Sequence, residues 1–167
     1  MSPPPSADPA PGASHAADRP VILVVDDYAE TRRLLYFYLR ATYEVVMVES
    51  AEEALAYLGG NRVDLVVMDI NFQDGMNGMA ATERIRADPA LQHLPVLATS
   101  AYAYPDDRAR FLKAGFNDYI AKPIFKERML KKVRELLSGG ERGVWVTKKD
   151  TANDDKASPG ASAAQEG

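Results

Sequence analysis

The sequence contains no cysteine and only two histidines among its 167 residues. Disulfides, cysteine nucleophiles and thiolate metal sites all require a thiol, so none of them is available to this chain. No apolar run approaches the roughly 20 residues that a membrane-spanning helix needs. Residues 1–18 also lack the basic start and the apolar middle of a signal peptide. These absences predict a cytoplasmic protein that does not insert into a membrane.

Basic charge is also scarce, because 20 lysines and arginines stand against 24 aspartates and glutamates, for a net charge of -4. Binding to nucleic acid phosphates depends on a surplus of basic side chains, so direct DNA binding is not expected. The segment after Ser138 is too short and too polar for a helix-turn-helix unit. We therefore expect no attached output domain, and an output that consists of binding another protein.

Both ends of the chain are rich in small and turn-forming residues. Residues 1–18 hold five prolines, at positions Pro3, Pro4, Pro5, Pro9 and Pro11. Such segments bury too little apolar surface to offset the entropy of ordering. We expect a disordered tail at 1–18, one folded domain at 19–138 and a flexible tail at 139–167. Trp145 in the second tail either docks back onto the domain, stays disordered or grips a partner.

Between the tails, short apolar runs alternate with segments of helical periodicity. Strands are expected at 21–25, 44–48, 63–69, 94–100 and 116–121, and each is followed by a helix, including 76–87, the stretch from Pro105 to Gly115, and 125–137. Alternating strands and helices build a parallel sheet with helices on both faces. The expected fold is α/β, a flavodoxin-like doubly wound five-stranded parallel sheet in strand order 2-1-3-4-5 with five helices.

Chemically reactive side chains stand where four of these runs end. Asp26 and Asp27 follow the first run, Asp69 ends the third, Ser100 ends the fourth and Lys122 follows the fifth. Ligands of open α/β sheets bind outside the carboxyl ends of the strands. Strands one and three are neighbours in the expected order, so the three aspartates should converge, with Ser100 and Lys122 arriving from the strands beyond.

Three carboxylates this close repel one another, and a hard divalent cation such as Mg²⁺ relieves the repulsion. We expect Asp27 and Asp69 to be direct ligands and Asp26 to act through a water. A backbone carbonyl after Asp69, that of Asn71, would supply a further oxygen. The sequence thus predicts a Mg²⁺ site.

Phosphoryl transfer is the chemistry that suits such a site, because it depends on positioning and on charge neutralisation. Asp69 is the best nucleophile candidate, since carboxylates form acyl phosphates. The Lys122 ammonium can pair with Asp69 and then with the phosphoryl group, and the Ser100 hydroxyl can donate to a phosphoryl oxygen. Taken singly, each aspartate is more often a helix N-cap, Lys122 a solvated lysine and Ser100 a turn residue. Together at consecutive strand ends they favour a phosphate and metal site.

At these residues the chain resembles the receiver domain of two-component response regulators, of the single-domain, CheY-like and DivK-like kind, from about Pro20 to Ser138. The resemblance is carried by Asp26-Asp27, Asp69 followed by Asn71, residues 94–101 and residues 118–123. It implies that Asp69 accepts a phosphoryl group from a sensor histidine kinase or phosphotransfer protein, with Mg²⁺ held by Asp26 and Asp27. It also implies a self-phosphorylating and self-dephosphorylating switch and not a turnover enzyme.

The same resemblance implies a switch pair, Ser100 and Tyr119, that alters the face made by helix four, strand five and helix five. A downstream effector protein would read this face, and a homodimer could form through it. The resemblance also implies a cis bond between Lys122 and Pro123. Without the resemblance, Tyr119 is better explained as an ordinary half-buried strand aromatic.

The loop at residues 71–78 departs from the family pattern, because it lacks the usual proline and has Asn77 before Gly78. A receiver-like scaffold that acts without phosphorylation is therefore the main alternative. A haloacid-dehalogenase-type phosphatase fits less well, because that family expects two acids two residues apart at the first strand. A dinucleotide-binding module fits least, since the turn after the first strand is acidic and not glycine-rich.

Overall fold

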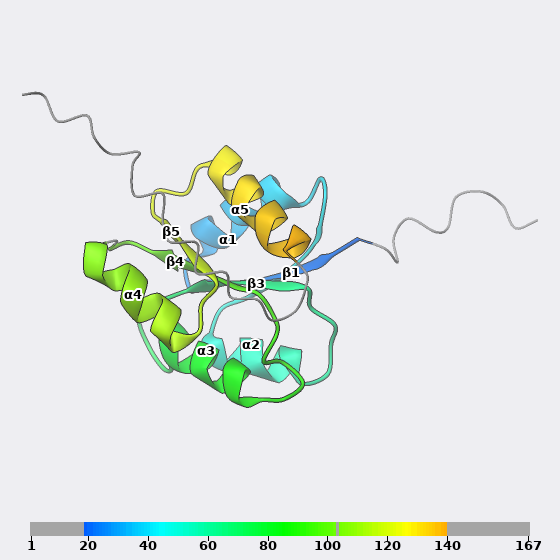
Figure 1. Ribbon diagram of the computed structural model, residues 1–167. Helices are drawn as coiled ribbons and strands as arrows, with labels where there is room; N and C mark the ends of the chain where they lie inside the picture. The colour runs from blue at the N-terminus through cyan, green and yellow to red at the C-terminus, as the bar shows by residue number, and fades with distance from the viewer. Residues whose placement is uncertain (1–18, 103, 140–167) are drawn as a thin grey trace, which may run out of the picture.

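A computed structural model describes residues 19–102 and 104–139, in which five strands alternate with five helices. The Trp145 segment lies outside the described residues. All strand pairs are parallel and the sheet order is β2-β1-β3-β4-β5, which confirms the expected flavodoxin-like topology (Figure 1). The strands are β1 Val21–Val25, β2 Glu44–Val48, β3 Leu65–Asp69, β4 Val96–Ser100 and β5 Asp118–Ala121, and the helices are α1 Ala29–Leu39, α2 Ala51–Leu58, α3 Gly78–Ala87, α4 Pro105–Ala114 and α5 Lys126–Ser138.

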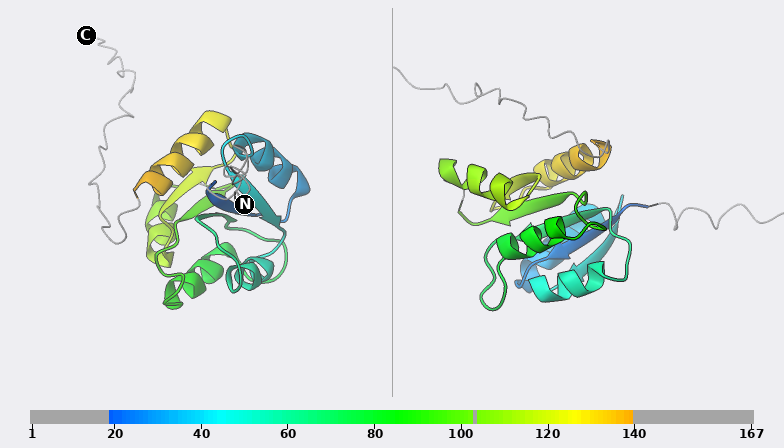
Figure 2. Two further views of the ribbon diagram at one scale, coloured as in Figure 1. Left: turned by 90° about the vertical axis from the view of Figure 1, so that its right-hand side faces the viewer. Right: turned by 60° about the horizontal axis from the view of Figure 1, so that its bottom comes forward.

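The helices cover both faces of the sheet, with α1 and α5 on one side and α2 and α3 on the other (Figures 1 and 2). Side chains alternate between the two faces along each strand. In β1, Ile22 and Val24 pack with α1 and α5, whereas Leu23 and Val25 pack with α2, α3 and α4. All four are at most 1% exposed, so β1 is buried on both faces. The central strands are fixed in place by two separate apolar clusters.

Three strands, β3, β4 and β5, start two residues later than the sequence predicts. The residues just before each of them make hydrogen bonds that involve polar side chains. The carboxylate of Asp64, before β3, accepts from the Val21 N–H at 2.8 Å. The Asn117 side chain, before β5, accepts from the Val96 N–H at 2.8 Å. The carbonyl of Leu94, before β4, accepts from the Arg86 guanidinium at 2.7 Å. These contacts belong to the loops before the strands, so the strands begin only after them.

The helix ends largely follow the local sequence signals. The Ser50 hydroxyl caps α2 by accepting from the Glu53 N–H at 3.1 Å, as its position before the helix predicts. Gly115 ends α4 with φ 106°, a left-handed conformation that favours glycine. The prediction for α3 was two residues early, because the Asn77 side chain caps the helix by accepting from the Ala80 N–H at 2.8 Å.

This arrangement brings the carboxyl ends of β1, β3, β4 and β5 to one edge of the sheet, where the predicted site residues stand (Figure 1). The bond between Lys122 and Pro123, which follows β5 directly, is cis as expected. Within the described part of the chain, none of the helices combines the length and the apolar character that crossing a bilayer requires.

Candidate functional site

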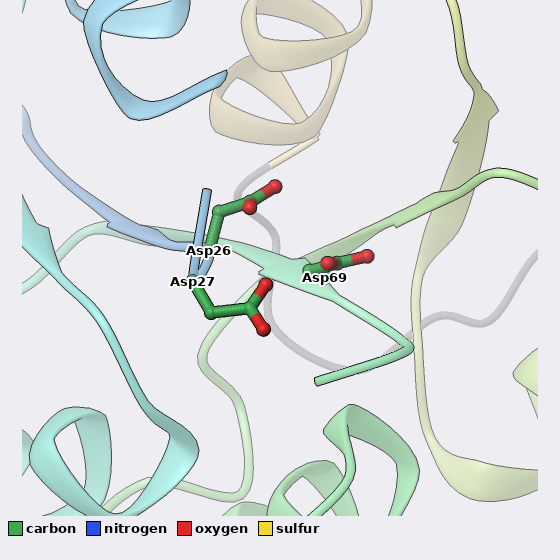
Figure 3. Close-up of side chains that lie close together, drawn as sticks. All are labelled: Asp26, Asp27 and Asp69. Carbon is green, nitrogen blue, oxygen red and sulfur yellow. The ribbon is translucent and has the colours of Figure 1, made fainter. Parts of the chain in front are cut away.

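Three aspartates meet at the carboxyl ends of β1 and β3, which confirms their predicted convergence (Figure 3). Asp26, Asp27 and Asp69 each offer a carboxylate oxygen, and these oxygens all lie within 4.8 Å of one another. Asp26 and Asp69 are buried and Asp27 is half-buried. Carboxylates at this separation repel strongly in a partly desolvated site, so the cluster is stable only if a cation or a proton compensates the charge.

Lys122, which follows β5, supplies the one ammonium group that contacts this cluster among the described residues. Its Nζ lies 3.1 Å from Asp26 Oδ2 and 3.5 Å from Asp69 Oδ2, so it contacts both acids. The other oxygen of Asp26 accepts from the Tyr28 N–H at 2.8 Å. The sequence predicted the contact to Asp69 but not the shorter one to Asp26. A single ammonium beside three carboxylates leaves the site with an excess of negative charge.

The pKa of Asp69 shows the result of this charge balance. Burial, followed by the nearby Asp26 carboxylate, raises the pKa of Asp69 from 3.8 to about 6. The Lys122 ammonium and a hydrogen bond from the Asn71 backbone oppose the rise without cancelling it. Burial disfavours the charged form of any carboxyl group, and a second carboxylate adds to that effect. Any further positive charge placed beside Asp69 therefore stabilises the charged form of its carboxyl group.

Asp27 shows most directly that the residues fit a cation. One of its oxygens, Oδ2, accepts from the Gln73 N–H at 2.9 Å. The other, Oδ1, is buried and has no hydrogen-bond partner among the described residues. A buried carboxylate oxygen without a partner is costly. Together with the neighbouring carboxylates, it provides the all-oxygen environment that Mg²⁺ prefers.

Ser100 ends β4 at the same edge of the sheet, and Tyr119 lies inside the neighbouring strand β5, opposite Ala98. The buried Ser100 hydroxyl donates to the Tyr102 carbonyl at 2.6 Å and accepts from the Tyr102 N–H at 3.2 Å. A cavity of about 350 Å³ adjoins it, and Asn71, Ser100 and Phe111 are among the lining residues. The half-buried Tyr119 ring packs 5.9 Å from the Phe111 ring. Ser100 therefore lines this cavity, whereas Tyr119 packs against Phe111, which lines it as well.

Besides the contact between Lys122 and Asp26, the contacts of two further residues at the site were not expected from the sequence. Arg32 of α1 donates to the Asp26 carbonyl at 2.7 Å and to Glu49 at 2.7 Å, although helical periodicity places it on the polar face with Arg33. Gln73 donates to Asp27 from the loop after β3. The only signal for Gln73 is that its loop departs from the family pattern, and nothing in the sequence separates Arg32 from Arg33.

Comparison with known proteins gives a consistent assignment. A sequence model of the response regulator receiver domain matches residues 22–134. The polar-differentiation response regulator DivK of Brucella anthropi is 30% identical over 117 residues, which are 70% of this chain and 94% of that protein. The crystal structure of chemotaxis protein CheY4 from Vibrio cholerae matches with a TM-score of 0.67 and 25% identity, over 71% of this chain and 98% of that one.

A further solved structure bears on the acidic cluster. The receiver domain of sensor histidine kinase PA1611 from Pseudomonas aeruginosa PAO1 was solved with a magnesium ion coordinated in its active-site cleft. It matches with a TM-score of 0.66 and 29% identity, over 72% of this chain and 98% of that one. Receiver domains bind Mg²⁺ at an acidic pocket, and they are signalling switches that interact with histidine kinases and effectors. The chain belongs to the response regulator receiver domain family of two-component signalling.

Proposed function

We propose that this receiver domain is a Mg²⁺-dependent switch in which Asp69 accepts a phosphoryl group from a sensor histidine kinase or phosphotransfer protein. The observation that carries the proposal is the cluster of three carboxylates, together with an Asp27 oxygen that is buried and has no hydrogen-bond partner in the described part of the chain. Asp27 and Asp69 would hold the ion directly, Asp26 through water and Asn71 through its backbone carbonyl. When bound, Mg²⁺ supplies positive charge that offsets the charge of the carboxylates and the phosphoryl group.

In the proposed transfer, an oxygen of the Asp69 carboxylate attacks the phosphorus of a phosphohistidine. The new bond is an acyl phosphate, the phosphorus–nitrogen bond breaks, and the released imidazole takes a proton from solvent. The Asp69 carboxyl must be ionised to attack, although its pKa is raised to about 6. The Lys122 ammonium, 3.5 Å from Asp69 Oδ2, favours the ionised form and can then pair with the phosphoryl oxygens.

The switch would start at the Ser100 hydroxyl. A new phosphoryl group on Asp69 adds nearly two negative charges, and a hydroxyl that donates to it gains a charge-assisted hydrogen bond. To do so, Ser100 must release the Tyr102 carbonyl, to which it now donates at 2.6 Å. Tyr119 would then move toward the vacated space and change the face formed by α4, β5 and α5. The exposed apolar residues on or beside α4 are Tyr102, Tyr104 and Leu112. A downstream effector protein or a second copy of the chain would contact this face there.

The phosphoryl donor would approach from another direction. Tyr28 and Phe37 are exposed on and before α1, and Phe125 is exposed before α5. The hydroxyl of Tyr38 on α1 donates to the Ile124 carbonyl at 3.2 Å, which joins α1 to the segment before α5. We infer that residues 19–138 are the folded unit, that it acts in the cytoplasm, and that its output is protein binding and not turnover or DNA binding.

The scaffold alternative rested on the irregular loop at residues 71–78. In the structure this loop donates a hydrogen bond to Asp27, so it completes the acidic pocket and does not disrupt it. The geometry therefore gives no support to a receiver that works without phosphorylation.

The phosphatase alternative expects a second acid two residues after the first. Tyr28 stands at that position after Asp26, so the first strand does not fit the pattern of that family.

The proposal is tested by incubating the purified protein with Mg²⁺ and acetyl phosphate and measuring bound phosphate. Base-labile phosphate should appear, depend on Mg²⁺, and be absent from Asp69→Asn. The matched control is Asp74→Asn, which removes an exposed acid from the neighbouring loop and should be labelled like the wild type. No labelling of the wild type by acetyl phosphate or by any histidine kinase would reject the proposal in favour of the scaffold.

A further inference from the structure

The loop between β3 and α3 is attached to two elements that are distant in the sequence. Gln73 makes two contacts to the segment after β1: its backbone N–H donates to Asp27 Oδ2 at 2.9 Å, and its side-chain amide donates to the Tyr28 hydroxyl at 2.9 Å. Three residues on, the Met76 N–H donates to Glu52 Oε1 of α2 at 2.8 Å. The loop is therefore held at both of its ends across the acidic pocket.

The attachment to α2 leaves little freedom in the loop. Gly75 has φ 81°, and a Cβ at this position would come within 2.8 Å of Glu52 Oε1. The loop thus follows a path that only glycine adopts without strain. The hydrogen bond from Met76 lowers the pKa of Glu52, because it stabilises the charged carboxylate. These two features fix the distal part of the loop against α2.

The attachment to the β1 end decides how Asp27 is oriented. With Oδ2 bound to the Gln73 N–H, the Asp27 carboxylate keeps Oδ1 buried and without a hydrogen-bond partner among the described residues, while one of its oxygens belongs to the cluster of carboxylate oxygens. The backbone N–H can hold Oδ2 only while the loop stays over the pocket. The Gln73 side chain and the Tyr28 hydroxyl supply a second bond between the same two segments. Gln73 and Tyr28 are both exposed, so this second bond does not depend on the core.

We propose that Gln73 is a positioning residue of the cation site, whose contact with the Tyr28 hydroxyl holds the loop closed so that Asp27 is oriented for Mg²⁺. This inference rests on the proposed function and deepens it, because it names what sets the affinity of the site for its ion. Gln73 acts through Asp27 and the loop. Loss of the contact between Gln73 and Tyr28 should therefore raise the Mg²⁺ dissociation constant. The phosphorylation rate at saturating Mg²⁺ should stay nearly unchanged.

Two small substitutions test the same contact from opposite sides. Tyr28→Phe removes only the accepting hydroxyl, and Gln73→Ala removes the donating amide while keeping the backbone N–H. Tyr36→Phe is the matched control, because it removes a hydroxyl from α1 roughly 12 Å along the helix axis from Tyr28, which precedes this helix. Circular dichroism melts check that each variant folds. The Mg²⁺ dissociation constant is measured by calorimetry on the full chain.

Both single variants should weaken Mg²⁺ binding by about 3- to 10-fold, the effect of one lost hydrogen bond. The double variant should be no weaker than either single one, because both changes break the same contact. The control should bind like the wild type. Dissociation constants within twofold of the wild type, or single effects that multiply in the double variant, would overturn the inference.

Labelling by acetyl phosphate in the same samples separates this inference from the proposed function. Wild-type protein that is labelled on Asp69, together with variants of unchanged Mg²⁺ affinity, would remove the role of Gln73 and leave the proposed function intact. Wild-type protein that neither binds Mg²⁺ nor becomes labelled would overturn both.

Discussion

At the scale of single residues, Asp69 is the group whose environment differs most from that of an exposed acid. Its pKa of about 6 in the folded protein, against 3.8 for an ordinary aspartate, means that the folded state binds the proton more tightly than the unfolded state does. Above about pH 6 the buried carboxylate therefore destabilises the fold, by roughly 3 kcal/mol as an upper value. This cost fades as the pH falls from about 6 to below 3.8.

The corresponding prediction concerns Asp69→Asn in the absence of Mg²⁺. The neutral amide avoids the cost, so the variant should be more stable than the wild type by about 1–3 kcal/mol near pH 8. The difference should shrink toward zero near pH 4, where the wild-type carboxyl is protonated. Urea unfolding with a chelator present measures both values, and adding Mg²⁺ should stabilise only the wild type. Equal stability at both pH values would contradict the burial argument.

The residue types at the site could be predicted, but their contacts could not. Asp26, Asp27 and Asp69 are recognisable because they follow buried runs whose ends must meet at one edge of a parallel sheet. The preference of Lys122 for Asp26 and the bond from Gln73 to Asp27 depend on side-chain rotamers and on the path of a loop. The hydrophobic pattern of a sequence indicates which face of a helix or strand is buried. It carries no information about side-chain rotamers or the path of a loop.

At the scale of elements, the junction between β3 and α3 is packed so closely that its first helical residue has no room for a side chain. The Gly78 N–H donates to the Ile70 carbonyl at 3.0 Å. A Cβ on Gly78 would lie 2.0 Å from the Asp69 carbonyl oxygen, an impossible contact with backbone. The first turn of α3 can lie against the end of β3 only because this residue has no side chain.

We therefore predict that Gly78→Ala destabilises the domain by about 3 kcal/mol or more, because the backbone has to move to relieve the overlap. Gly60→Ala is the control, since a Cβ there meets nothing within 4 Å. It should change the free energy of unfolding by less than about 1 kcal/mol. Urea denaturation compares the two variants. If Gly78→Ala were as stable as Gly60→Ala, the close packing of α3 on Asp69 would be wrong.

The order and type of all ten elements were predicted from the sequence, whereas several of their ends were not. Element type follows from hydrophobic period, and that signal is strong in runs such as Val21–Val25. The ends are decided by polar side chains that take backbone hydrogen bonds, as Asn117 does before β5 and Asn77 does before α3. Such contacts form only when the chain is folded, so hydrophobic periodicity alone misplaces these element ends by two residues.

At the scale of the whole molecule, exposed aromatic residues stand on two groups of elements. One includes Phe37 of α1 and Phe125 before α5, and the other includes Tyr102 and Tyr104 before α4, whose rings stack with centroids 6.5 Å apart. Exposed aromatic residues of this size are common in protein interfaces. Their placement on different elements suits a protein that takes a phosphoryl group from one partner and signals to another.

The central claim is that the acidic pocket directs a phosphoryl group to Asp69 and to no other acid. The most direct measurement is to treat the Mg²⁺- and acetyl phosphate-incubated protein with borohydride, which converts an aspartyl phosphate to homoserine. Peptide mass spectrometry then locates the modified residue. The account predicts homoserine at position 69 alone, and only when Mg²⁺ is present. Modification of Asp26 or Asp27 instead, or none at any position, would contradict it.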